Sequence, residues 1–298
     1  MQDYLAFSID LEDAEVVSAY DELPLWSAMF GLLLLEHIPL YRQTTVLDVG
    51  HGTGFPLIEL AERLGSACRV HGIDRWEMAL KRAQRKARVR GVENVSLWQG
   101  DAAAMPFRDG EFDLVVSNLG INNFSDPDAV LRECWRVSRP AATLALTTNL
   151  QGHMREFYEV FEATLLDLSL SEAIPALRRH IEHRATVEGL TALFERTGFH
   201  LTKVHRATSS MRFADGSALL NHYFIKLGFL DGWKNVLEPG DLGRAFARLE
   251  TNLNALAEAR GQLKLTIPMA YVEAVRFDDP EAAAAQKVKS RARPPDGL

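Results

Sequence analysis

Short apolar runs alternate with helical segments through the first half of this chain, and this rhythm constrains its fold more than any other feature. Typical strands are "TTVLDVG", "CRVHGID", "VSLWQGD", "FDLVVSN" and "ATLALTTN". The segments between them carry apolar residues at helical spacing. Strands that alternate with such helices predict an α/β fold, in which a mostly parallel sheet has helices on both faces. The strands are apolar throughout, as expected when both faces are covered.

The remaining chain is more helical. We predict helices within residues 10–42, 152–197 and 215–260, and two late strands at "HLTKVHRATSSMRF" and "LKLTIPMAYVEAVR". The predicted parts are an N-terminal helical lid over 1–43, a cofactor-binding α/β core over 44–150, late strands with helical cap insertions over 151–276, and a tail over 277–298 that we expect to be mobile.

Composition narrows the function classes. The chain has 298 residues, 47% of them apolar, and a net charge of −7, so bulk charge does not favour binding to nucleic acid. Its two cysteines, Cys68 and Cys134, cannot build a disulfide framework or a cysteine-rich metal site. The first residues lack the pattern of a signal peptide, and the longest apolar run is too short to span a bilayer. We expect a cytoplasmic protein with no bound metal, no nucleic-acid partner and no membrane span, and a homodimer is left open.

The stretch "VLDVGHGTGF" places three glycines, Gly50, Gly52 and Gly54, directly after the first strand. Glycine lets the backbone approach a ligand closely because no Cβ intervenes. The third glycine comes one residue too early for the dinucleotide pattern G-x-G-x-x-G, and no Gly-Lys-Ser/Thr ending marks a P-loop. A turn that needs glycine for packing alone is the weaker interpretation, because three glycines follow Asp48 on an apolar strand.

Polar residues end the next three strands as well. Asp74 comes twenty residues beyond Gly54, where a carboxylate can accept hydrogen bonds from both hydroxyls of a ribose. It can also start the helix that follows. Asp101 and Asn118 end the third and fourth strands. Because ligands bind beyond the carboxyl ends of parallel strands, we expect these four positions to face one crevice.

The motifs "VLDVGHGTG", "GID", "GDAAAMPF" and "FDLVVSNLGINNF", in this order, resemble those of class I S-adenosylmethionine-dependent methyltransferases. The resemblance covers about residues 44–150. Within the family, the sequence resembles most the branch that includes ubiquinone and menaquinone biosynthesis methyltransferases. It implies a Rossmann-like seven-stranded sheet with an antiparallel last hairpin. It also implies S-adenosylmethionine as the cofactor and S-adenosylhomocysteine as its product.

The resemblance also implies a set of cofactor-binding residues: Asp48, Gly50, His51, Gly52, Gly54, Asp74, Arg75, Trp76, Asp101, Ala102 and Asn118. The glycine loop and Asp48 would lie at the methionine part, Asp74 at the ribose, and Asp101 with Ala102 at the adenine. Asn118 would lie near the methyl group. Two positions depart from the family pattern: His51 in the loop, which could touch a ligand or face solvent, and "SRPAA" where Pro-Gly-Gly is common.

Residues for the methyl acceptor are harder to choose, because a sulfonium methyl is already activated and a base is needed only when the acceptor must lose a proton. Our candidates come from the helical segments on either side of the core. The catalytic candidates are His222, His153 and Tyr20, and the substrate-binding candidates are Tyr20, Arg212, His222 and Tyr223. For each histidine, packing in an apolar core is the competing interpretation.

The leading hypothesis is therefore an enzyme that transfers a methyl group in line to a small, partly apolar metabolite. The alternatives are an RNA or protein methyltransferase and a non-catalytic module that binds S-adenosylmethionine. The basic run "KRAQRKARVRG" supports RNA binding weakly, because no aromatic residues interleave to stack bases. A nicotinamide oxidoreductase ranks last because of the glycine spacing.

Overall fold

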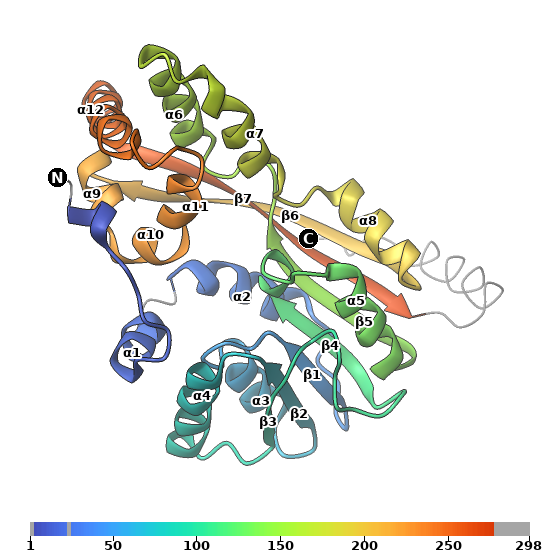
Figure 1. Ribbon diagram of the computed structural model, residues 1–298. Helices are drawn as coiled ribbons and strands as arrows, with labels where there is room; N and C mark the ends of the chain where they lie inside the picture. Colours follow the sequence, from blue (N-terminus) through green and yellow to red (C-terminus); the bar gives the residue numbers. More distant parts are fainter. Residues whose placement is uncertain (1–2, 23–24, 277–298) are drawn as a thin grey trace. The chain divides into compact units, whose positions relative to one another are not determined.

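The computed structural model describes residues 3–22 and 25–276 (Figure 1), so the predicted tail lies outside the described residues. These residues form two compact units. Unit 1 takes residues 3–22 and 25–29, Thr148–Val187 and Arg206–Ala270. Unit 2 takes Phe30–Thr147, Glu188–His205 and residues 271–276. Each unit therefore combines stretches that lie far apart in the sequence.

The sheet has seven strands in the order β3-β2-β1-β4-β5-β7-β6. The strands are β1 (Thr45–Val49), β2 (Arg69–Asp74), β3 (Val95–Gln99), β4 (Phe112–Asn118), β5 (Ser138–Asn149), β6 (Phe199–Phe213) and β7 (Leu263–Arg276). The first five pair in parallel, whereas β6 and β7 point in opposite directions (Figure 1). This arrangement confirms the predicted Rossmann-like sheet with its antiparallel last hairpin.

Unit 2 holds β1 to β4 and most of β5. Its helices are α3 (Leu57–Leu64), α4 (Glu77–Arg90), α5 (Pro127–Val137), most of α8 (Val187–Arg196) and the short η2 (Gly120–Asn122). The inner strands are fully buried at Val46, Leu47 and Val115, because helices pack around the sheet. Asp126 accepts a hydrogen bond from the Ala129 N–H at the start of α5, as its Asp-Pro pair predicts.

The strand order reverses between β1 and β4, which lie side by side although β2 and β3 come between them in the sequence. Such a reversal leaves a crevice at the carboxyl ends of the strands, where ligands bind in open α/β sheets. The predicted cofactor-binding residues lie at or directly after the carboxyl ends of β1, β2, β3 and β4, which are neighbours on this side of the sheet.

Unit 1 is mostly helical. It contains η1 (Asp3–Ala6), α1 (Ala14–Glu22), α6 (Arg155–Asp167), η3 (Ser171–Ala173), α7 (Ile174–Glu182), α9 (Gly216–Asn221), α10 (Tyr223–Gly228), α11 (Leu230–Lys234) and α12 (Leu242–Arg260). The helix α2 (Leu25–His37) and the strands β6 and β7 run through both units. Phe161, Phe246 and Leu253 are fully buried in unit 1, so it has an apolar core of its own.

The helix α5 ends at Val137, because Ser138 already pairs with Phe112 in the sheet. Ala141, in the "SRPAA" stretch that begins β5, has φ of +62°, a left-handed conformation that glycine adopts more easily. Among the helices of the described residues, none is long and apolar enough to cross a bilayer.

Candidate functional site

The glycine loop after β1 uses its glycines for two purposes. Gly50, Gly52 and Gly54 all have positive φ, at +79°, +53° and +98°. A Cβ on Gly54 would lie 2.9 Å from Ile58 Cδ1 and 3.1 Å from Ala83 Cβ, so this glycine lets α3 and α4 pack against the loop. A Cβ on Gly52 would meet no heavy atom within 4 Å. The loop is therefore open at Gly52 and closed at Gly54.

Asp48 lies at the base of this loop with no solvent exposure. Among the described residues, none donates a hydrogen bond to either carboxylate oxygen. Burial, with a smaller contribution from the nearby Asp74 charge, raises the pKa of Asp48 to about 8. A buried carboxyl without partners is unfavourable, so this group is suited to a ligand that brings a donor or a positive charge.

Asp74 ties the loop to the start of α4. One carboxylate oxygen accepts a hydrogen bond from the Gly52 N–H at 2.7 Å, and the other accepts one from the Trp76 N–H at 2.8 Å. Both interpretations made from the sequence therefore remain open. The aspartate does order the turn before α4, and its two oxygens still have lone pairs for further donors. Arg75 is exposed, and Trp76 is half-buried.

The ends of β3 and β4 carry the other predicted residues. Asp101 is exposed and accepts a hydrogen bond from the Ala103 N–H at 2.8 Å, and Ala102 is half-buried. Asn118 is buried, and its side-chain oxygen accepts a hydrogen bond from the Thr147 hydroxyl at 2.7 Å. The cofactor-site predictions thus all lie in unit 2, at the ends of adjacent strands.

His51 does not face solvent, which was one of the two alternatives for this position. The ring is 2% exposed, and its Nδ1 lies 2.8 Å from the Gly52 carbonyl oxygen. Burial lowers its pKa, although the Asp74 charge opposes this. A Cβ on Gly72 would lie only 2.7 Å from the His51 ring. Gly72 of β2 therefore makes room for the histidine beneath the loop.

Sequence reasoning missed two residues that shape the crevice. The Ser117 hydroxyl donates a hydrogen bond to the Val49 carbonyl at 2.7 Å, which joins the ends of β4 and β1. A Cβ on Gly120 would lie 2.3 Å from Ser117 Oγ and 2.9 Å from the Val49 oxygen. Only glycine fits where the chain crosses the end of β1. The glycine in "SNLGINNF" was the available signal.

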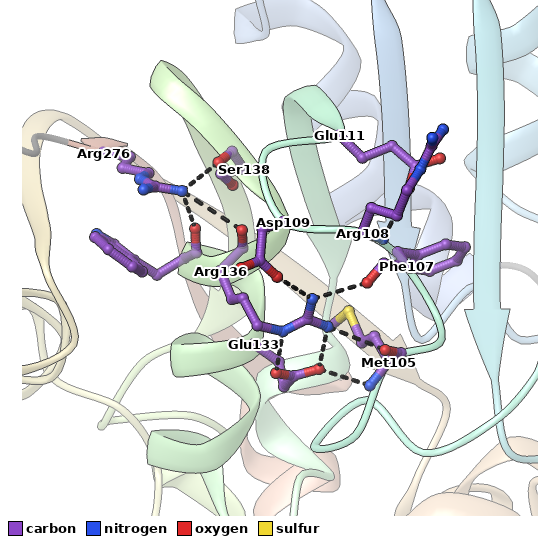
Figure 2. A network of polar contacts seen from close by, with 10 residues as sticks. Met105, Phe107, Arg108, Asp109, Glu111, Glu133, Arg136, Ser138 and Arg276 are labelled. Carbon is purple, nitrogen blue, oxygen red and sulfur yellow. Dashed lines mark hydrogen bonds and ion pairs between the residues drawn. The ribbon is translucent and has the colours of Figure 1, made fainter.

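A polar network holds the loop that follows Asp101 (Figure 2). Arg136 of α5 donates hydrogen bonds to the carbonyl oxygens of Met105, at 3.0 Å, and Phe107, at 2.7 Å. Glu133 accepts from the Met105 N–H at 2.7 Å and pairs with Arg136. The hydrogen bond from Arg136 lowers the pKa of Glu133. The N–H and the carbonyl oxygen of Met105 are thus both hydrogen-bonded to α5. These bonds fix the position of the loop beside the predicted adenine site.

Unit 1 contains the predicted acceptor residues. His153 is 1% exposed, and its ring packs against Trp26, with centroids 5.3 Å apart, and stacks on Phe229 at 5.5 Å. Neither ring nitrogen has a hydrogen-bond partner among the described residues. Burial, together with the charge of Arg184, lowers the pKa of His153 to about 3. It is a neutral imidazole inside an aromatic cluster.

The other candidates are more dispersed within unit 1. His222 joins α9 to α10, packs against Phe213, and has its pKa lowered by burial. Tyr223 packs edge-on against Phe7. Arg212 is exposed on β6, and Tyr20 is exposed on α1. The structure gathers Trp26 and His153 into one cluster, and the roles of Tyr20, Arg212, His222 and Tyr223 stay predictions.

Comparison with known proteins adds a family and a fold. A family model described as "Methyltransferase domain" matches residues 40–198. A demethylmenaquinone methyltransferase from Listeria welshimeri is 38% identical over 122 residues, covering 41% of this chain and 52% of the relative. This chain thus spans about half the length of the curated relatives it matches.

Two solved structures share the fold. The YcgJ protein from Bacillus subtilis has a TM-score of 0.56 at 16% identity, covering 85% of this chain and all of that one. A protein from Bacillus halodurans, titled a putative methyltransferase, has a TM-score of 0.54 at 21% identity, covering 83% of this chain and 98% of that one. At such identities these likenesses support the fold alone.

Proposed function

Because this chain belongs to the methyltransferase domain family, we propose that it uses S-adenosylmethionine to methylate a small, partly apolar metabolite. One observation carries the proposal. The glycine loop leaves an open side at Gly52, directly beside a buried Asp48 whose two oxygens lack donors. The cofactor's methionine part brings an ammonium group, which is what such a carboxylate requires.

The other strand ends supply the remaining contacts of the proposed site. Asp74 would accept hydrogen bonds from the ribose hydroxyls with its free lone pairs. Asp101 and Ala102 would contact the adenine, with the loop that Arg136 clamps behind them. Asn118, oriented by Thr147, would lie near the methyl group. Each part of the cofactor thus has a matching residue. Asp48 suits the ammonium group, Asp74 suits the ribose hydroxyls, and Asp101 and Ala102 suit the adenine.

When bound, S-adenosylmethionine supplies an activated sulfonium methyl group. The protein's task is then to align an acceptor atom and to exclude water. Such positioning can lower the activation barrier by on the order of 7–11 kcal/mol. A neutral His153 could accept a proton from a hydroxyl acceptor, and the surrounding rings favour an apolar molecule. The curated relatives are named for demethylmenaquinone, which agrees with an apolar acceptor.

The test has two stages. Calorimetry with S-adenosylmethionine and S-adenosylhomocysteine should show binding of both nucleosides at a one-to-one ratio. A metabolite screen with methyl-labelled cofactor should then show transfer to a small molecule. If neither nucleoside binds, the proposal fails. If both bind but only RNA or protein becomes labelled, the acceptor class is wrong.

A further inference from the structure

Arg184 of unit 1 lacks a counterion. It follows the end of α7, and its side chain is half-buried. Its Nε is completely buried and has no hydrogen-bond partner among the described residues. No ion pair joins it to an Asp or Glu in the described part of the chain. Arg178, six residues earlier, instead pairs with Glu162 at 2.7 Å on the surface. A positive charge withdrawn from water without an anion is unfavourable.

The side chains around Arg184 are uncharged at neutral pH. Its Nη1 donates to Nε2 of His183, whose Nδ1 in turn lies 2.5 Å from the His180 carbonyl oxygen. The Tyr158 hydroxyl also interacts with Arg184. Burial and the Arg184 charge lower the pKa of His180 to about 4, and the same two causes lower the pKa of His183. Burial raises the pKa of Tyr158. The local net charge is therefore +1.

The tyrosine is held in place by a short chain of hydrogen bonds. Trp233 Nε1 donates to the Tyr158 hydroxyl at 3.2 Å, and this hydroxyl lies 3.2 Å from His180 Nε2. Since Trp233 donates to the oxygen, the hydroxyl proton can go to a neutral His180 or to an incoming anion. The site therefore offers a guanidinium and a hydroxyl whose proton can be redirected.

Aromatic rings continue from this polar group into the interior of unit 1. Trp233 stacks on Phe157 at 4.0 Å between centroids and on Phe229 at 5.9 Å. Phe229 stacks on His153 in turn. A molecule that places an anion at Arg184 would thus find an apolar, ring-lined neighbourhood next to it. No group of three His, Cys, Asp or Glu side chains in residues 3–22 and 25–276 is placed to hold a metal, so the histidines are not assigned to one.

We propose that Arg184 and Tyr158 bind the carboxylate of an apolar acid. A guanidinium matches a carboxylate in shape, with two parallel N–H donors. The net charge of +1 matches a monoanion better than a phosphate dianion. That this acid is the methyl acceptor rests on the proposed function, whereas the anion site itself does not.

The experiment uses the full chain and three related probes in calorimetry: 3-phenylpropionate, its neutral amide and 2-phenylethyl phosphate. We expect the carboxylate to bind at least tenfold more tightly than the amide, and more tightly than the phosphate. Arg184→Gln should remove this preference. Arg178→Gln, on the helix that precedes Arg184 but paired at the surface, should keep it. Tyr158→Phe should weaken the carboxylate severalfold, and it decides the matter if Arg184→Gln does not fold.

Equal binding of acid and amide, or unchanged binding in both Arg184→Gln and Tyr158→Phe, would overturn the proposal. Tighter binding of the phosphate would overturn the carboxylate assignment. Titration of the same preparations with S-adenosylhomocysteine separates this result from the proposed function. If that nucleoside does not bind while the acid does, the methyltransferase proposal fails and the acid site stands.

Discussion

The two units each bury an ionisable side chain without a partner, but they assemble its surroundings differently. In unit 2, Asp48 lies among the carboxyl ends of adjacent parallel strands, where the neighbouring Asp74 accepts hydrogen bonds from backbone N–H groups. In unit 1, His153 contacts the rings of Trp26 in α2 and of Phe229 between α10 and α11, three positions that are far apart in the sequence. A site made of strand ends depends on strand order, whereas a site made of packed rings depends on the whole tertiary fold.

The largest expected effect separates the two glycines of the loop in unit 2. Gly52→Val should abolish measurable binding of S-adenosylhomocysteine, because its side chain enters the open side of the loop. The positive φ at this position costs only about 1–2 kcal/mol for a residue with a Cβ, so the protein should stay folded. Gly54→Val should instead overpack α3 and α4 and lower stability by about 1–3 kcal/mol. Calorimetry and thermal melting check both variants. Normal cofactor binding by Gly52→Val would refute the proposal that the cofactor binds at the open side of the loop.

Asp48→Asn tests whether the loop aspartate is held neutral by burial. Its folded pKa of about 8 lies above the ordinary unfolded value of about 4, so the folded protein binds more protons between these pH values. Wild-type stability should therefore fall as pH rises from about 4 to 8, whereas the variant lacks this slope. Near pH 7 the variant should be more stable by about 4 kcal/mol if these two pKa values hold, and it should bind the cofactor more weakly. Denaturant titrations across this range measure the difference, and a constant gap would contradict the assignment.

Asp74→Ala should weaken S-adenosylhomocysteine binding at least tenfold, about 1.4 kcal/mol, because a charge-assisted ribose contact is lost. Asp113→Ala is the matched control in unit 2. Asp113 also accepts a backbone hydrogen bond, from the Thr45 N–H at 2.9 Å, and pairs with Arg139. It lies near the start of β4, at the opposite end of the strands, so it should leave affinity unchanged. Equal losses in the two variants would mean that Asp74 acts only through stability.

The smallest effect on nucleoside binding is expected in unit 1. His153→Phe should leave nucleoside affinity unchanged and stop methyl transfer if the imidazole accepts the proton. The pKa of about 3 lies below the ordinary unfolded value of about 6.5, so the unfolded chain binds more protons between these values. Wild-type stability should fall as pH drops through this window, by about 1–2 kcal/mol between pH 7 and pH 5. The variant should lose this dependence. Full activity in His153→Phe would remove the catalytic assignment.

Some features of this protein were predictable because neighbours in the sequence determine them. The alternation of apolar runs and helices predicted the first five strands, the patterns of two later segments predicted β6 and β7, and the Asp-Pro pair predicted the start of α5. The polar residues after four successive strands had to meet at one edge, since parallel strands align their carboxyl ends. The family resemblance carried by these motifs was confirmed by the match over residues 40–198.

Other features depend on contacts between distant residues, and only the tertiary structure decided them. His51 is buried because Gly72 of another strand makes room for its ring. Arg184 is left without a counterion because the chain brings it beside Tyr158 and His183 rather than beside an acid. The sequence by itself determined the succession of strands and helices along the chain, and with it which residues stand where each strand ends. Burial, which sets the charge state of Asp48, His153 and their neighbours, is a property of three-dimensional packing, and no periodicity along the chain encodes it.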